Sequence, residues 1–336
     1  MEFLLHSDFP KGLKEQWDTL LGQSIIDIPF LRYAYLENWW HTRGGGEWTN
    51  EIQLAIVSAH EDNILLGIAP FFISKENEKN VLYLLGSKEI CDYLDLIIKP
   101  ADLEQFVREL INFITNKSFP RWDQIVLDNL LQSSPSVPAL EKAANELGWN
   151  FKSECKKHSP FIRLPGNWEE YLNSIDNKQR HEIRRKMRRA EENTDLKWYF
   201  VEEESSLDDE IEAFLQLMAM DKEKSNFLTI PMREQMRLTM QWAFKAKILQ
   251  LSFLEIQDQK AASYLCFHYE SKTLVYNSGF DPKFSEYSPG WVLLANLLRW
   301  ANENQIIEFD FMRGNEDYKY RFGAKDRFII CVKIDR

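Results

Sequence analysis

The chain has 336 residues, of which 44% are hydrophobic and 28% are charged, and its formal net charge is −11. This length allows two domains of ordinary size, and the composition is typical of a soluble globular protein. The acidic balance argues against a general nucleic-acid coat protein, although it leaves room for a local basic groove.

The N-terminal segment has no basic region and no long apolar core, so it does not have the pattern of a signal peptide. No run approaches the roughly 20 apolar residues that a membrane-spanning helix needs. We therefore expect a cytoplasmic protein. The four cysteines form no CxxC pair and the histidines are scattered, so no metal site is expected. Each cysteine has apolar neighbours, which predicts small buried hydrophobic residues.

The first half of the chain alternates strand and helix patterns. Strands are predicted at 2–6, 52–59, 64–74, 81–85, 93–98, 125–127 and 149–155. Helices are predicted at 12–21, 30–40, 101–116 and 137–147.

The second half follows a similar order. Strands are predicted at 198–201, 248–256, 261–269, 273–280, 306–311 and 328–334, and helices at 207–221, 232–245, 291–304 and around Tyr318. If 81–85 and 93–98 are taken as pieces of one strand, both halves share the order β-α-α-β-β-β-α-β-α-β without evident sequence identity. This predicts two similar α/β (α+β) units, each a mixed sheet flanked by helices. We expect them at 1–160 and 196–336, connected by a basic helical segment at 161–195.

The stretch from Tyr276 to Gly323 concentrates the polar residues that suggest chemistry. Two strand ends and a helix start follow one another closely here, and ligands bind at such edges of α/β sheets. A helix N-terminus offers N–H groups to an anionic or carbonyl oxygen. Pro289 suits the first helical position and Ser288 the cap before it. Candidate cofactor-binding residues are Ser288, Gly290 and Trp291, and candidate substrate-binding residues are Asp281, Arg313 and Gly314.

Three motifs occur in order in this stretch: SPG at a helix start, then FDFMRG, then YKYRFG. Together they resemble the C-terminal half of GNAT-type acyltransferases of the CelD-like branch, which is linked to extracellular polysaccharide modification. More distantly, they resemble FemAB-type aminoacyl transferases. The resemblance continues through FLRYAYLENWW, YLLGSKEICDYLDL and NKQRHEIRRKMRRAEE. It implies two GNAT-like units in tandem and transfer of an acyl group.

The resemblance also implies catalytic roles. Lys319 matches a lysine that stabilises charge on the carbonyl under attack in a FemAB-type enzyme, an oxyanion-type interaction. Tyr318 matches tyrosines that act as general acid for a departing thiolate in GNAT enzymes. The alternatives are a surface lysine and a core aromatic residue. Alternation places Glu308 and Asp310 on one strand face, where one of them could pair with Arg313. Asp310 is then a base or, as we favour, a residue that orients Tyr318 or Lys319.

Asp92 and Tyr93 match an aspartate–aromatic pair in the N-terminal domain of FemAB-type enzymes, near the acceptor amine. The resemblance implies that Asp92 is a base or an amine-orienting group and that Tyr93 contributes to substrate binding. The alternative is an aspartate that caps a turn.

The segment NKQRHEIRRKMRRAEE predicts a helix dense in arginine. Arg180, Arg184 and Arg188 share one face by their i, i+4 spacing, beside a narrow apolar stripe of Ile183 and Met187. One interpretation is a phosphate site for the pyrophosphate of CoA or for a nucleotide-linked substrate. The other is a solvated face whose arginine stems cover the connection between the two units.

The sequence alone leaves more than one acyl donor to consider. GNAT enzymes that bind CoA usually carry an (R/Q)xxGxG/A-like loop, whereas this chain has EYSPGW, where Pro289 removes one N–H group. The first hypothesis is an acyltransferase that moves acetyl from acetyl-CoA to an amine or hydroxyl of a sugar or cell-envelope polysaccharide precursor. The second is an aminoacyl-tRNA-dependent transferase. The third is a non-catalytic module that binds an anionic ligand, which gains weight if Lys319 and Asp310 point into packed cores.

Overall fold

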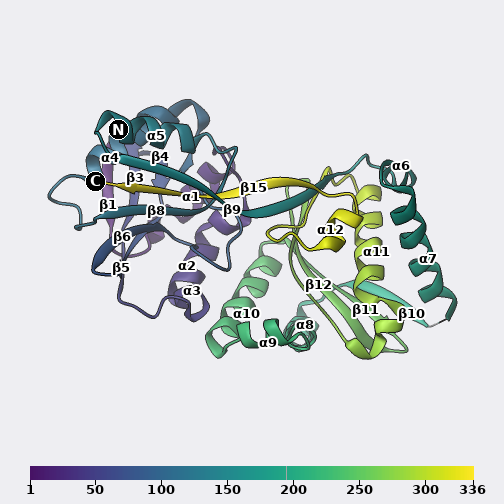
Figure 1. The fold of residues 1–336 in the computed structure, drawn as a ribbon. Coiled ribbons are helices and arrows are strands. Elements are labelled where there is room, and N and C mark those ends of the chain that lie inside the picture. Colours follow the sequence, from purple (N-terminus) through teal and green to yellow (C-terminus); the bar gives the residue numbers. More distant parts are fainter. Residues whose placement is uncertain (194) are drawn as a thin grey trace. The chain divides into compact units, whose positions relative to one another are not determined.

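A computed structural model of the chain describes residues 1–193 and 195–336 (Figure 1). The chain forms two compact units. Unit 1 comprises 1–157 and 328–336, and unit 2 comprises 158–327. Each unit is a mixed α/β structure in which helices flank the sheets, as the sequence predicts.

The chain passes from unit 1 to unit 2 within β9 (Asn150–Arg163) and returns within β15 (Lys325–Asp335). The units therefore differ from the expected ranges in two ways. The basic segment at 161–195 is part of unit 2, and the C-terminal residues 328–336 are part of unit 1. A hydrophobic pattern locates each strand, but it does not reveal that one long strand contributes residues to both units.

Unit 1 contains two groups of paired strands. One has the order β1-β3-β4-β7 and is antiparallel throughout, with the bounds Glu2–His6, Ile56–Glu61, Ile64–Ala69 and Ile97–Ile98. The other has the order β2-β5-β6-β8-β15, in which β2, β5, β6 and β8 span Ile52–Leu54, Phe71–Glu76, Lys79–Leu84 and Gln124–Leu131. β6 and β8 are parallel, so this group is mixed. The helices are α1 (Lys14–Leu21), α2 (Tyr33–His41), α3 (Arg43–Gly46), α4 (Leu103–Ile114) and α5 (Ser136–Glu146).

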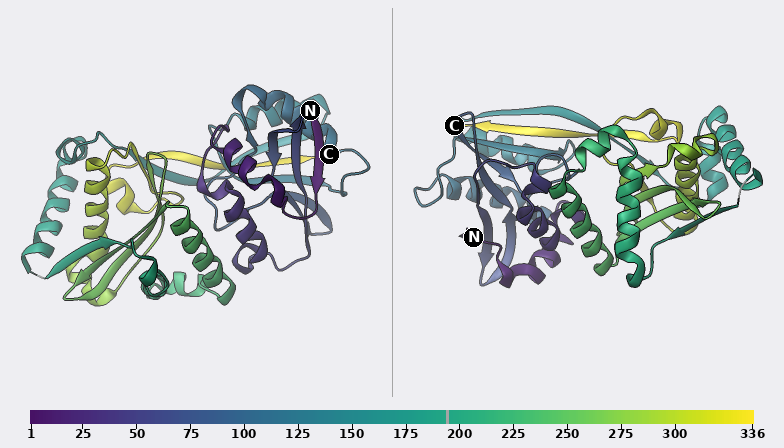
Figure 2. Two further views of the ribbon diagram at one scale, coloured as in Figure 1. Left: turned by 180° about the vertical axis from the view of Figure 1, so that it is seen from behind. Right: turned by 90° about the horizontal axis from the view of Figure 1, so that it is seen from below.

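Unit 2 has the strand order β10-β11-β12-β13-β14-β9. The first five strands span Leu196–Phe200, Leu249–Ile256, Gln259–Tyr269, Lys272–Phe280 and Glu308–Asp310. Its helices are α6 (Trp168–Ser174), α7 (Asn177–Asn193), α8 (Leu207–Ala219), α9 (Lys222–Phe227), α10 (Ile230–Lys245), α11 (Pro289–Glu303) and α12 (Asp317–Arg321). Within unit 2, α8 and α10 cover one sheet face and α11 the other, with α6 and α7 outside α11 (Figure 2). In unit 2 the predicted strands and helices are present, and α9 is an additional helix. In unit 1 the strand predicted at 52–59 is divided into β2 and β3, and the one predicted at 64–74 into β4 and β5, which belong to different groups of paired strands. The strand predicted at 93–98 is limited to β7, and α3 was not predicted.

The apolar stripe of α7 is buried inside unit 2. Ile183, Met187 and Ala190 join the core cluster that includes Leu293 and Leu297 of α11. Full burial of an aliphatic side chain contributes about 1.5–3 kcal/mol, so this stripe is enough to fix α7 against α11. The basic face of α7 consequently points away from the core.

Gly279 lies so close to α8 that an added Cβ would be 2.4 Å from the main-chain nitrogen of Met218, so this position of β13 requires glycine.

The expectation of four buried cysteines is wrong at one position, because Cys155 is exposed whereas the other three are buried. Cys155 lies in β9, where most side chains are exposed.

Candidate functional site

The neighbouring parallel strands β13 and β14 of unit 2 separate at their carboxyl ends. They pair only over Lys272–Leu274 and Glu308–Asp310. β13 then continues to Phe280 with β12 as its partner, whereas the chain after β14 follows β9, to which Phe311 donates its N–H. On the β14 side, the main chain of 275–280 therefore has no strand partner among the described residues. Such an edge offers main-chain groups to a ligand.

Helix α11 begins directly beyond this edge. Asp281 holds the connecting turn, because its carboxylate accepts the N–H of Lys283 at 2.8 Å. Pro289 occupies the first helical position, as predicted, and Ser288 precedes it with φ of 52°. The predicted capping by Ser288 is wrong, since its side chain makes no capping hydrogen bond in this left-handed conformation. The first-turn N–H groups are thus left without a side-chain acceptor from the cap residue.

The space in front of α11 is open at Gly290 and bordered by Trp291. A Cβ added at Gly290 would meet only a ring carbon of Phe280, at 4.0 Å. The Trp291 ring packs on Phe322 with a centroid distance of 4.6 Å. Its indole N–H is buried and has no hydrogen-bond partner among the described residues. An unsatisfied donor beside a helix start is suited to an oxygen-rich ligand.

A cation from α7 lies over the same tryptophan. The ammonium of Lys186 is 4.0 Å from the Trp291 ring centroid and 3.6 Å from a carboxylate oxygen of Glu182. Burial lowers the pKa of Lys186, and the charges of Arg185 and Arg321 lower it further against the opposing effect of Glu182. The basic helix thus brings positive charge to the start of α11.

Lys319 is buried and fully engaged. Its side chain is 3% exposed, and its ammonium donates to the carbonyls of Arg313 at 2.7 Å and Gly314 at 3.2 Å. The carboxylate of Glu316, which is 57% exposed, lies 2.9 Å away. These three acceptors match the three donors of an ammonium. The alternative of an exposed surface lysine is therefore wrong.

Gly314 shapes the loop that holds this ammonium. Its φ is +107°, and an added Cβ would lie 2.4 Å from the Glu316 carboxylate. Both the backbone conformation and the approach of Glu316 favour glycine here. Arg313 contributes its main-chain carbonyl to the same loop.

A second lysine, which sequence analysis missed, lies close to Lys319. Lys224 of α9 donates its ammonium to the carbonyl of Ser278 at 2.6 Å, in the part of β13 that has no strand partner on the β14 side. Burial lowers the pKa of Lys224, and the Lys319 charge also lowers it, whereas Asp221 and Glu316 raise it. The only sequence signal was Asp221, which caps α9 by accepting the N–H groups of Glu223 and Lys224.

Tyr318 lies against the core of unit 2, with its ring 6.1 Å from that of Phe311 in an edge-on arrangement. Burial raises the pKa of Tyr318, and the charges of Glu316 and Cys266 raise it further. The phenol therefore stays protonated at neutral pH, and it is a weaker acid than an ordinary tyrosine.

Asp310 takes part in a buried ion network. Asp310 and Glu308 are buried, with 1% and 6% of their surfaces exposed, and both pair with Arg327. A guanidinium nitrogen of Arg327 is 3.7 Å from the Asp310 carboxylate and 2.7 Å from the Glu308 carboxylate. Asp310 also accepts the N–H of Met312 at 2.8 Å. The guanidinium packs over the Phe161 ring, 3.9 Å from its centroid. Arg327 was not foreseen, because sixteen residues of chain lie between it and Asp310 and no local pattern connects them.

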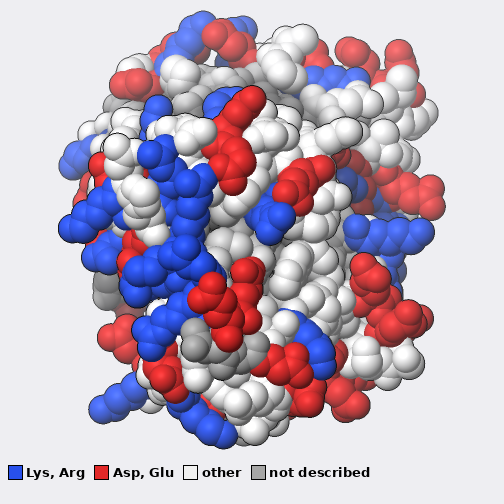
Figure 3. Space-filling model, turned by 90° about the vertical axis from the view of Figure 1, so that its right-hand side faces the viewer, with Lys and Arg blue, Asp and Glu red and all other residues white. Residues whose placement is uncertain are grey.

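The arginine face of α7 forms a band of positive charge with acidic residues beside it (Figure 3). Arg180 is held by the side-chain oxygens of Asn173, at 2.8 Å, and Asn177, while Arg184 pairs with Glu169. Arg188 is exposed and has no side-chain partner among the described residues. The i, i+4 face is therefore present, although two of its three arginines already have polar partners.

Asp92 and Tyr93 lie in unit 1, in the loop between β6 and β7, and are 6% and 1% exposed. The amide of Asn129 holds this loop by donating to the carbonyls of Lys88 at 2.8 Å and Cys91 at 2.7 Å. The buried setting constrains Asp92, and its role near an acceptor remains a prediction.

Asp95, three residues further on, is completely buried. One of its carboxylate oxygens accepts the Leu96 N–H at 2.8 Å, and the other accepts the hydroxyl of Ser134. Burial raises the pKa of Asp95 to about 6 against these hydrogen bonds, compared with 3.8 for an ordinary aspartate. The folded state thus binds a proton more tightly than the unfolded chain does.

This shift predicts a pH dependence of stability. The pKa of Asp95 is higher in the folded state than in the unfolded chain. Protonation of Asp95 therefore contributes fully to the free energy of unfolding below the unfolded pKa, and this contribution is lost as pH rises from about 4 to about 6. The loss, on the order of 3 kcal/mol, should be absent in Asp95→Asn. Urea unfolding from pH 4 to pH 7 measures it, with Asp62→Asn in an exposed turn as the control. Parallel curves for wild type and Asp95→Asn would refute the assignment.

Apart from α9, unit 2 has the order of strands and helices that the sequence predicts for a GNAT-like unit. Consistently, residues 177–320 match the acetyltransferase (GNAT) domain family. This match contains β13, α11, β14 and Lys319. Within unit 2, residues 177–320 are therefore similar to a GNAT acetyltransferase domain, and both units have the mixed α/β architecture.

Solved structures show the same fold over the whole chain. FemX aligns with a TM-score of 0.68 and 12% identity, covering 99% of this chain and 97% of FemX. A conserved protein of unknown function from Bacteroides thetaiotaomicron VPI-5482 aligns with a TM-score of 0.61 and 10% identity, with 100% of both chains covered. L-PGS from Bacillus licheniformis aligns with a TM-score of 0.56 and 9% identity over 95% of this chain and 90% of L-PGS. Identities this low establish the fold alone.

No curated protein matches the sequence. None of the described helices is long and apolar enough to cross a membrane. Within residues 1–193 and 195–336, no three His, Cys, Asp or Glu side chains gather in a way that would hold a metal ion.

Proposed function

We propose that unit 2 is an acyltransferase whose acyl donor lies along the open edge of β13 with its phosphates at the start of α11. The observation that carries this proposal is the separation of β13 from β14 after Leu274, directly before an α11 start that lacks a side-chain cap. The acceptor is an amine or hydroxyl of a sugar or cell-envelope polysaccharide precursor, in a cytoplasmic protein of the CelD-like branch.

In the proposed reaction, the acceptor nitrogen attacks the acyl carbon and loses a proton, and the carrier sulfur leaves and takes up a proton. Negative charge develops on the carbonyl oxygen, where an ammonium stabilises it. Lys319 supplies this positive charge when the exposed Glu316 carboxylate moves away from its ammonium. The ammonium then keeps its two hydrogen bonds to main-chain carbonyls, which hold it in place. Tyr318 is the proton donor to the leaving sulfur. The role of Asp92 in unit 1, as base or orienting group for an acceptor, stays a prediction from the resemblance to FemAB-type enzymes.

Acetyl-CoA, or another acyl-CoA, is the proposed donor. The first turn of α11, the cation Lys186 and the unpartnered Trp291 N–H together favour a pyrophosphate at this place. Aminoacyl-tRNA is the second candidate donor, because the exposed cations of α7, including Arg188, suit a longer anionic ligand.

Thermal melts with added ligands rank these donors. A ligand that binds the folded state raises the midpoint by mass action. We expect the largest shift with acetyl-CoA or CoA, and smaller shifts with UDP-sugars and tRNA. A shift with tRNA alone would select the second donor. The absence of any shift with CoA and tRNA would favour a non-catalytic binding module, with which the burial of Lys319 and Asp310 is also compatible.

Lys186→Met should weaken CoA binding by about tenfold or more, because one charge-assisted contact is worth roughly 1.5–3 kcal/mol. Methionine keeps an apolar stem over the Trp291 ring and removes only the charge. Titration calorimetry with CoA measures the effect, with Arg188→Met on the exposed face of the same helix as the control. Equal affinities in both variants would exclude a phosphate site at Lys186.

A further inference from the structure

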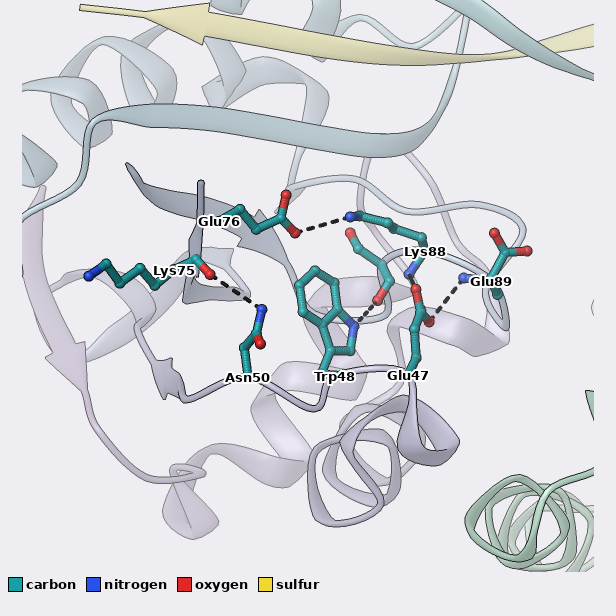
Figure 4. Close-up of polar contacts among 8 residues, drawn as sticks. Glu47, Trp48, Asn50, Lys75, Glu76, Lys88 and Glu89 are labelled. Carbon is teal, nitrogen blue, oxygen red and sulfur yellow. Dashed lines mark hydrogen bonds and ion pairs between the residues drawn. The ribbon is translucent and has the colours of Figure 1, made fainter. Parts of the chain in front are cut away.

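In unit 1, the ammonium of Lys88 lies against two aromatic rings and a carboxylate (Figure 4). It is 4.9 Å from the ring centroid of Trp48, 5.1 Å from that of Tyr83 and 3.2 Å from Oε1 of Glu76. A cation within about 6 Å of an aromatic face is attracted by its negative quadrupole. We call Trp48, Tyr83 and Glu76 the ammonium cage.

The walls of the ammonium cage are held in place without help from the Lys88 side chain. Trp48 and Tyr83 are 7% and 2% exposed, and their rings contact each other with a centroid distance of 5.0 Å. The Trp48 indole donates to the carbonyl of Ser87 at 2.6 Å, and its ring packs edge-on against Phe72. The cage is therefore pre-organised, which lowers the cost of binding a ligand.

The main chain of Lys88 is fixed by residues outside the cage. Its N–H donates to Glu47 at 3.1 Å, and its carbonyl accepts the side-chain amide of Asn129 at 2.8 Å. The Lys88 side chain itself is 40% exposed. The ammonium can consequently leave the cage by rotation of its own side chain, while the loop keeps its main-chain contacts.

The charges around the cage favour a cation. Three carboxylates, on Glu47, Glu76 and Glu89, surround the loop. The ammonium groups beside them belong to Lys88 and to Lys157, which is 3.7 Å from Glu89. Burial raises the pKa of Glu47, and the neighbouring charge of Glu89 raises it further. Removal of the Lys88 charge would leave this place with a surplus of negative charge.

We propose that the ammonium cage binds the primary alkylammonium group of a ligand, and that Lys88 occupies the cage when no ligand is present. The cage follows from its own contacts in unit 1 and is independent of the acyl transfer proposed for unit 2. A tethered ammonium has an effective concentration in the millimolar range. A small free amine therefore competes poorly in the wild type, and a larger ligand displaces Lys88 by making further contacts.

Lys88→Ala with n-butylammonium as the probe tests this directly. Tryptophan fluorescence of the full chain should change in a saturable way, with an apparent Kd at least about tenfold lower than in the wild type. Lys75→Ala is the matched control, since Lys75 pairs with Glu78 and is not part of the cage. n-Butanol, which has the same chain without the charge, should cause no saturable change. Glu76→Gln in the Lys88→Ala background should weaken binding again.

Equal responses of Lys88→Ala, Lys75→Ala and wild type to n-butylammonium would overturn the proposal, as would equal effects of n-butanol. Lys88→Gln keeps the side-chain length and gives the same comparison if alanine destabilises the loop. Because these titrations need no acyl donor, failure of the cage and failure of acyl transfer by unit 2 are separate outcomes.

Discussion

Arg327→Met should lower the free energy of unfolding by roughly 3–5 kcal/mol, because it leaves two buried carboxylates without their cation. Glu308 and Asp310 both lie on the Arg327 guanidinium, whose side chain is 22% exposed. Methionine preserves much of the contact with Phe161 and removes the charge. Urea unfolding at pH 7 measures the loss.

Arg321→Met is the matched control in the neighbouring helix. Arg321 pairs with Asp317 at 2.6 Å, but both side chains are more than half exposed. Exposed pairs of this kind contribute at most about 1 kcal/mol. Equal losses of unfolding free energy in the two variants would show that the network around Asp310 does not stabilise β14. Neutralising Glu308 and Asp310 together should recover stability only in the Arg327→Met background.

Lys319→Met should lower the acyl-transfer turnover by roughly 10²–10³, as the loss of an oxyanion donor does. Substrate binding should change little, because the charge that Lys319 stabilises exists mainly in the transition state. Steady-state kinetics with the donor selected by the melts separates the two effects. Lys319→Arg should recover only part of the rate, since a planar guanidinium does not replace a point donor.

Lys319 also binds its own loop, so this experiment needs two controls. Lys325→Met removes an exposed lysine a short distance along the chain and should leave the rate unchanged. Glu316→Gln removes the negative charge that competes for the ammonium and should not reduce the rate as Lys319→Met does. Normal turnover in Lys319→Met, or equal losses in Lys319→Met and Glu316→Gln at equal folded fractions, would assign Lys319 to loop structure alone.

Local sequence patterns predict most of the elements of this fold. Apolar spacing locates α4 and α11, and Pro289 marks the start of α11. The order of the elements and the motif stretch then indicate a GNAT-like unit before any contact is known. Periodicity and turn chemistry depend on neighbouring residues, which is why they can be derived from one sequence.

The partners of the site residues could not be predicted in the same way. Arg327 reaches Asp310, and Lys224 reaches Ser278, only after the chain has folded back on itself. Ser288 has the residue type of a helix cap, but its left-handed conformation directs the side chain elsewhere. The choice between a buried and an exposed Lys319 likewise depends on the loop at Gly314, whose φ no sequence pattern specifies.

The proposed acyl donor lies along the open edge of β13 and at the first turn of α11. Hydrogen exchange of the full chain, with and without saturating acetyl-CoA, measures whether a ligand covers these two segments. We expect slower exchange of the amides at 275–280 and 290–292, with Lys186→Met reducing this protection. Unchanged exchange in both segments, or protection confined to other parts of the chain, would contradict this position of the donor.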